Sequence, residues 1–197
     1  MNRIYLIITF FILSKTIGQT VAEINQNIKL SEKLNTKELR IYKWYSITNG
    51  SELFRIYQLE NGNWNSEFYK YYNSTSKGKK PRFEFTKLKP ICDFNLIWLN
   101  LLESNIEFLP SITEIDYKLR GKSEIKFEQG EYEIYYSQIK PLDGNGYFGI
   151  IQNGTKTNSI DFGNYESYLK NYPEVDELNS YSKLILEIKK GFNIWQN

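Results

Sequence analysis

The sequence predicts an α+β domain, in which an antiparallel β-sheet built from hairpins packs against a central buried helix and C-terminal helices. Turn-forming pairs such as Asn49-Gly50 and Asn61-Gly62 recur at hairpin spacing, and the segments between them are short and rich in Ile, Tyr, Phe and Trp. Helical patterns are few and follow runs of strands. A chain of 197 residues, 41% hydrophobic and 24% charged, suits one globular domain.

Residues 1–18 are predicted to be a signal peptide. Arg3 precedes an apolar run over residues 4–13, and a polar stretch with small residues follows, which is the three-part layout of a secretory signal. The run is about half of the roughly 20 apolar residues that a membrane span needs. No Cys lies near the expected cleavage after Gly18. We therefore expect an exported protein, periplasmic or secreted, that is not lipid-anchored and has no transmembrane segment after cleavage.

The chain after the signal is expected to divide into a polar N-terminal tether or loose helix, residues 19–37, and a single α+β domain, residues 38–197. Turn positions in the first half of the domain predict four strands, near residues 38–48, 51–60, 63–73 and 81–89.

A helix is expected next, from an Asp93 N-cap through Asn105. Its side chains are apolar all round, which predicts that it is buried. Cys92, beside this apolar run, is expected to be a small buried hydrophobic residue.

The second half repeats the order of strands followed by helices. Alternating apolar and polar residues predict strands at 115–120 and 124–128, with further strands near 131–140, 146–152 and 155–161. Asn164 is expected to open a short helix. A longer helix should begin at Pro173, because apolar residues recur every three or four positions, acids crowd its start and lysines its end. The apolar stripe of this helix is Val175, Leu178, Tyr181, Ile185 and Ile188.

A resemblance rests on the segment Asp161-Phe-Gly-Asn-Tyr-Glu-Ser-Tyr168 followed by Tyr172-Pro173-Glu174. It resembles small secreted proteins of unknown function from AT-rich Gram-negative bacteria, in which a strand leads into an Asn-Pro-Glu-x-Tyr helix start. Tyr165 stands where that pattern has Pro, and the similarity covers about thirty residues. The resemblance, together with the aromatic strand from Trp64 to Tyr72, implies export and no particular activity.

Missing residue types exclude several chemistries. With no His, the chain has no Ser-His or Cys-His pair, and its single Cys cannot form an intramolecular disulfide or a thiolate zinc site. The phosphate-binding glycine motifs are absent, and we predict no cofactor and no metal. Removing residues 1–18 leaves equal numbers of acidic and basic side chains, so binding to nucleic acid is not expected. The basic stretch 70–90 is interpreted as a hairpin with a solvated loop at residues 74–80, and an anionic glycan, lipid or nucleic acid is the alternative partner.

Aromatic residues on the first three strands form the candidate binding surface. If both Asn-Gly pairs form two-residue turns, Trp44 lies across from Arg55, and one face carries the candidate ligand-binding residues. Such a face can bind a protein, a peptide or a glycan, or it can be internal packing. The residues are Tyr42, Trp44, Arg55, Tyr57 and Trp64.

Paired carboxylates provide the enzyme alternative. A turn at Gln129-Gly130 places Glu131 opposite Glu128 and Glu133 opposite Lys126, and two such carboxylates could cleave a glycosidic bond. A lysine across the strand lowers a carboxyl pKa, however, whereas a general acid needs a raised one. We therefore expect an exported binding or interaction module with no assigned catalytic residue, and a carboxylate-dependent, glycosidase-like hydrolase as the rival.

Export gives the first testable prediction. The mature chain should begin at Gln19, because small residues at Thr16 and Gly18 suit signal cleavage after Gly18. Intact-mass measurement of the protein recovered from the periplasm or medium checks this. A full-length species that only detergent extracts would contradict it.

Overall fold

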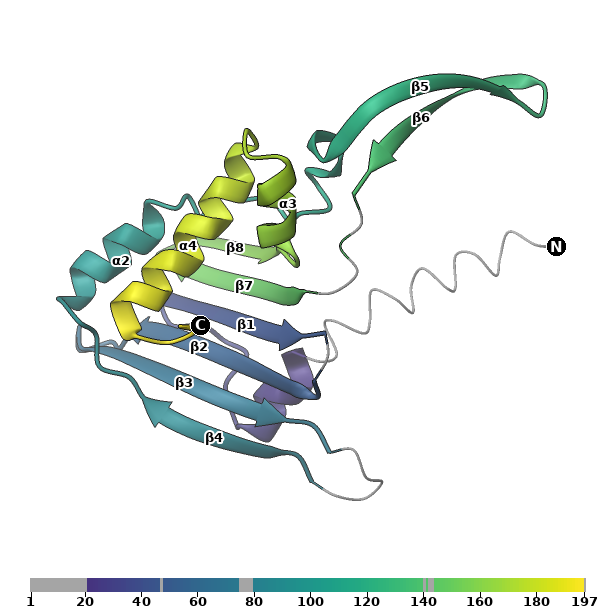
Figure 1. Cartoon of the computed structure of the whole chain (residues 1–197). Helices are drawn as coiled ribbons and strands as arrows, with labels where there is room; N and C mark the ends of the chain where they lie inside the picture. Colours follow the sequence, from purple (N-terminus) through teal and green to yellow (C-terminus); the bar gives the residue numbers. More distant parts are fainter. Residues whose placement is uncertain (1–20, 47, 75–79, 140, 142–143, 197) are drawn as a thin grey trace.

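The structure, a computed structural model, describes residues 21–46, 48–74, 80–139, 141 and 144–196. The expected signal peptide therefore lies outside the described residues. Six antiparallel strands form one sheet in the order β4-β3-β2-β1-β7-β8, and the helices that follow β4 in the chain pack on one face (Figure 1). This confirms the α+β fold. The strands of this sheet are β1 (Lys37–Tyr45), β2 (Gly50–Gln58), β3 (Trp64–Tyr72), β4 (Arg82–Lys87), β7 (Asn145–Asn153) and β8 (Lys156–Asp161).

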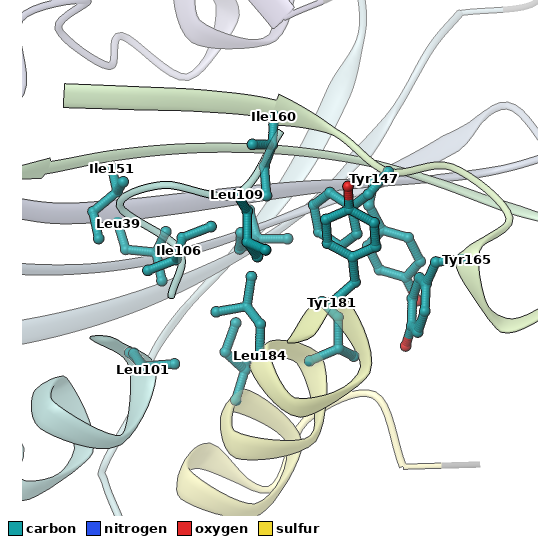
Figure 2. Packing of buried hydrophobic residues seen from close by; sticks show 14 of the residues in the cluster. Leu39, Leu101, Ile106, Leu109, Tyr147, Ile151, Ile160, Tyr165, Tyr181 and Leu184 are labelled. Carbon is teal, nitrogen blue, oxygen red and sulfur yellow. The ribbon is translucent and has the colours of Figure 1, made fainter. Parts of the chain in front are cut away.

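The C-terminal helix α4 (Asp176–Phe192) provides most of the helical layer. Its buried residues meet those of the central strands and α3 (Tyr165–Asn171) in one apolar core (Figure 2). The predicted stripe of this helix is confirmed, although the helix begins three residues after Pro173, with buried Val175 as its N-cap.

Helix α2 (Phe94–Leu102) is buried on one side only. The Asp93 carboxylate accepts a hydrogen bond from the backbone N–H of Asn95 at 2.8 Å, as expected of an N-cap. However, Leu96 and Leu99 are 51% and 61% exposed, so the expectation of burial all round is wrong. The helix packs on the sheet and α4, and no described element covers its outer side (Figure 1). Cys92 is likewise exposed rather than buried.

Residues 21–27 form a helix on the opposite face of the sheet. Ile24 is 1% exposed and packs with Tyr42, Leu53 and Tyr71 in a second, smaller apolar cluster. From residue 21 onward the expected tether is thus folded onto the sheet.

Strand register differs from the expectation in both early hairpins. Strands β1 and β2 pair so that Trp44 lies opposite Ser51, and Arg55 lies opposite Arg40. In the next hairpin Leu59 donates its N–H to the carbonyl of Asn63, and Gly62 has φ +84°. This is a three-residue loop with a left-handed glycine, not a two-residue turn. A shift by one residue reverses the faces of β3.

The hairpin of β5 (Arg120–Glu128) and β6 (Glu131–Gln138) projects from the body (Figure 1). Its register is as predicted, with Glu128 opposite Glu131 and Lys126 opposite Glu133. Gln129 and Gly130 have φ values of 53° and 92°, which suits a type I′ turn.

The strand expected at 115–120 is instead a turn with a short 3₁₀ helix, Asp116–Lys118. Ile115 and Leu119, four residues apart, are both buried. Helical turns bring residues at this spacing to one side, so both side chains reach the core.

Docking of α4 can be tested by truncation. Leu184→Ala should lower the free energy of unfolding by roughly 2–5 kcal/mol, because the Leu184 side chain of α4 is fully buried in the core. The control Lys183→Ala removes only an exposed ion pair to Glu103 and should cost less than about 1 kcal/mol. Urea unfolding measures both, and equal midpoints would show that α4 is not held by its buried face.

Candidate functional site

Two of the predicted binding residues, Tyr42 and Trp44, lie beside the N-terminal helical segment. Tyr42 is 1% exposed, and its hydroxyl donates to Asn25 Oδ1 at 2.7 Å. Trp44 is half-buried, stacks against Tyr42 at 6.4 Å between ring centres and lies across Gly146, where a Cβ would meet its ring at 3.3 Å. Tyr42 therefore belongs to the core. Trp44 lines a surface depression together with Thr48 and Asn49.

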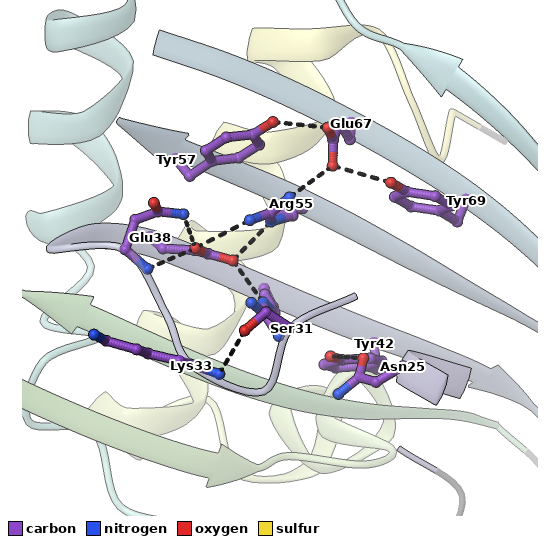
Figure 3. A network of polar contacts seen from close by, with 11 residues as sticks. Asn25, Ser31, Lys33, Glu38, Tyr42, Arg55, Tyr57, Glu67 and Tyr69 are labelled. Atoms are coloured by element: carbon purple, nitrogen blue, oxygen red, sulfur yellow. Dashed lines mark hydrogen bonds and ion pairs between the residues drawn. The ribbon is translucent and has the colours of Figure 1, made fainter. Parts of the chain in front are cut away.

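Arg55 and Tyr57 take part in an ion-pair network on the same face (Figure 3). Arg55 Nε lies 2.7 Å from Glu38 Oε1, and its Nη1 lies 3.0 Å from Glu67 Oε2. The Tyr57 hydroxyl donates to Glu67 Oε1 at 2.8 Å, and the Arg55 guanidinium stands 3.7 Å from the centre of the Tyr57 ring. The cation–π pair thus exists, but two carboxylates already neutralise its arginine.

Glu38 is the centre of this network. Its carboxylate is fully buried and also pairs with Arg40 Nε at 2.6 Å. Burial alone would raise the Glu38 pKa, but the hydrogen bond from Arg55, the charge of Arg40 and the Asn35 backbone N–H together lower it below its usual value. Within the described residues Arg40 Nη2 has no hydrogen-bond partner.

Trp64 lies on the other face of the sheet, because β3 is one residue out of the expected register. Its ring stacks on Phe94 at 6.2 Å and meets Trp98 at 5.3 Å, and its Nε1 donates to Asn95 Oδ1 at 3.0 Å. The prediction that Trp64 shares a face with the other four residues is wrong. These five residues do not form one exposed aromatic surface.

A polar pocket of about 470 Å³ lies on the helix-covered side of the sheet, where β1 and β7 meet α3 and α4. Lys43 enters from β1 and Lys189 from α4, while Glu166 and Ser167 come from α3. Figure 2 shows the rings of Tyr147 and Tyr165 at this end of the core. The other lining residues are Gly144, Asn145, Tyr147, Asn164, Tyr165, Ser182, Ile185 and Leu186.

Lys43 is the unusual charge of the pocket. It is 7% exposed, and its Nζ lies 4.7 Å, 5.7 Å and 5.6 Å from the ring centres of Tyr45, Tyr147 and Trp195. In the described part of the chain no carboxylate lies within 4.0 Å of it. Glu52, directly across the strand, accepts hydrogen bonds from Tyr45 and Trp195 instead.

Burial lowers the pKa of Lys43, and the charge of Lys189 adds to this effect against the opposing charges of Glu52 and Glu166. Glu166 Oε1 also accepts a hydrogen bond from the Tyr147 hydroxyl at 3.3 Å. Asn164 Oδ1 is buried with no hydrogen-bond partner among the described residues. The pocket therefore combines two ammonium groups and one carboxylate with neutral amide and hydroxyl side chains.

Sequence reasoning missed this pocket, although one signal was present. Lys43 lies between Ile41 and Tyr45 on one strand face that is otherwise apolar. A lysine at such a core position is unusual. The partners from α3 and α4 are more than a hundred residues away in the chain, and no local pattern connects them to Lys43.

No protein-family model matches the chain, and neither the curated proteins nor the solved structures contain a significant match. Among the described residues, no group of three or more Cys, Asp or Glu side chains is placed to hold a metal ion. No helix in the described part is long and apolar enough to span a membrane.

Glu38→Gln should lower the free energy of unfolding at pH 7 by roughly 3–5 kcal/mol, because it leaves buried Arg40 without its carboxylate. Glu67→Gln, at a partly exposed partner of Arg55, should cost less. Urea unfolding of both variants measures the difference, and similar losses would contradict a central role for Glu38.

The same network should make stability acid-sensitive. A carboxylate whose folded pKa is lowered contributes stability above its unfolded pKa, near 4.5, and loses it as pH falls through the lower folded value. Wild-type protein should lose stability below about pH 4.5, and Glu38→Gln should lose less over that range. Parallel curves for the two proteins would exclude this contribution.

Proposed function

We propose that this protein is an exported binding module that holds a small hydroxylated anion in the Lys43 pocket. The carrying observation is Lys43 itself, a buried ammonium that has aromatic rings around it and no carboxylate within 4.0 Å among the described residues. Export is part of the proposal and is supported by the pattern of residues 1–18.

An anion is the ligand that the charges of the pocket favour. Removing a charged group from water is unfavourable unless an opposite charge compensates it, and the lowered pKa of Lys43 reflects that cost. Lys189 lines the same pocket, so a carboxylate or phosphate group can lie near both ammonium groups. The negative charge of the ligand would stabilise the protonated form of Lys43.

Hydroxyl groups on the ligand are supported by the remaining polar atoms. Asn145 and Asn164 line the pocket, and their side-chain amides can exchange hydrogen bonds with a ligand hydroxyl. Ser167 and Ser182 offer hydroxyls, and the Glu166 carboxylate can accept a further hydrogen bond. Acidic sugars belong to this ligand class, so the proposal is compatible with a glycan, one of the three kinds of partner that the sequence left open.

The hydrolase alternative receives no comparable support. Glu131 and Glu133 lie on the exposed β5–β6 hairpin, and neither lines the pocket. A general acid needs an enclosed carboxyl, which that hairpin does not provide.

Binding should depend on Lys43. Thermal unfolding and calorimetric titration with glucuronate, gluconate, glycerol phosphate and neutral glucose should identify an anion that stabilises the wild-type protein. Lys43→Met should weaken that binding at least tenfold while keeping the fold, because it removes the charge and retains most of the side-chain volume. Lys190→Met is the matched control, since Lys190 is an exposed neighbour that does not line the pocket.

The pH dependence provides a second readout. The anion needs protonated Lys43, whose pKa lies below its ordinary 10.5, so affinity should fall as pH rises and should do so before 10.5. Lys43→Met should lack this decrease. No binding by any anion of the panel, or equal binding by Lys43→Met, would refute the proposal.

A further inference from the structure

The β5–β6 hairpin presents an apolar face on which none of the described residues packs. None of its described residues is buried. Cross-strand pairing puts Ile125 opposite Ile134 and Phe127 opposite Tyr132, with Tyr132 78% exposed. The other face carries Glu124, Lys126, Glu128, Glu131 and Glu133, and the Tyr135 hydroxyl donates to Glu128 and Glu133 at 3.0 Å each. Amphipathic surfaces of this kind mark interaction sites.

Charge identifies the kind of partner. Residues 124–133 contain four glutamates and one lysine, a net charge of −3. An anionic membrane surface would repel this segment. A partner with exposed apolar groups and basic side chains would fit it.

Strand β4 provides such a surface on the same chain. It is an edge strand whose residues are all exposed, and β3 is its only partner among the described strands. Phe83 and Phe85 are large exposed apolar residues that adjoin Tyr69 at 6.5 Å and 5.1 Å between ring centres. Residues 80–89 contain four basic residues and one glutamate, a net charge of +3.

The two surfaces lie too far apart to meet within one molecule. Figure 1 shows the hairpin extending away from the β7–β8 side of the sheet, whereas β4 is the opposite edge. We infer that the β5–β6 hairpin of one copy docks on the β4 edge of a second copy. Both the hairpin and β4 have unpaired strand edges, so backbone hydrogen bonds can continue the sheet across the contact.

This contact is head-to-tail, so it forms open chains unless its rotation closes a ring. Hairpin-to-hairpin pairing would instead bring two acidic segments together, which charge disfavours. The inference is independent of the Lys43 pocket, because neither surface contributes to its lining.

Charge exchange tests the contact in the full chain. Sedimentation and light scattering should show that wild-type mass rises with protein concentration and falls with added salt. The hairpin variant Glu131→Lys/Glu133→Lys and the edge variant Arg82→Glu/Lys87→Glu should each stay monomeric. The quadruple variant, with both surfaces reversed, should associate again.

Lys170→Glu/Lys190→Glu is the matched control, with the same change in charge as the edge variant on exposed lysines outside both surfaces. It should associate like wild type, and circular dichroism should show every variant folded. A wild-type protein that is monomeric up to about 1 mM would overturn the inference. So would an edge variant that still associates, or a folded quadruple variant that does not.

Discussion

Strand β1 lies between β2 and β7 and is covered on both faces, so each polar side chain on it needs a partner inside the protein. Leu39 and Ile41 face the helical layer, and Glu38 and Arg40 face the N-terminal segment. Glu38 connects the two arginines with Asn35. Because that single carboxylate joins β1, β2 and the chain before β1, the placement of the N-terminal segment depends on it.

Lys43 is on the same strand, but its charge is accommodated differently. The arginines around Glu38 form ion pairs with carboxylates. Lys43 instead lies beside three aromatic rings and lines a pocket. Rings stabilise a cation less than a carboxylate does in a desolvated site. Lys43 lacks a compensating carboxylate within 4.0 Å among the described residues, which is why the pocket is a stronger functional candidate than the aromatic face.

Much of the fold could be predicted from local pattern, but the candidate site could not. The β1–β2 register differs from expectation by an even number of residues, which preserves the face of Trp44. The β2–β3 register differs by one, which moves Trp64 into the helical layer. The first error lies in the position of the loop, which ends before Gly50, and the second in its length, because an Asn-Gly pair indicates that a reversal is near without specifying which residues form it.

The sequence by itself determined the elements whose energetics are local: the apolar stripe of α4, the Asp93 cap, and the Gln129-Gly130 turn with its register. Each depends on residues within about a turn or a hairpin of one another. Only the tertiary structure decided which surfaces are covered. Tertiary packing leaves Leu99 exposed and buries Tyr42 beneath residues 21–27. It also places Lys43 and Lys189 in the lining of one pocket. Burial depends on which distant elements pack together, and no local spacing encodes that.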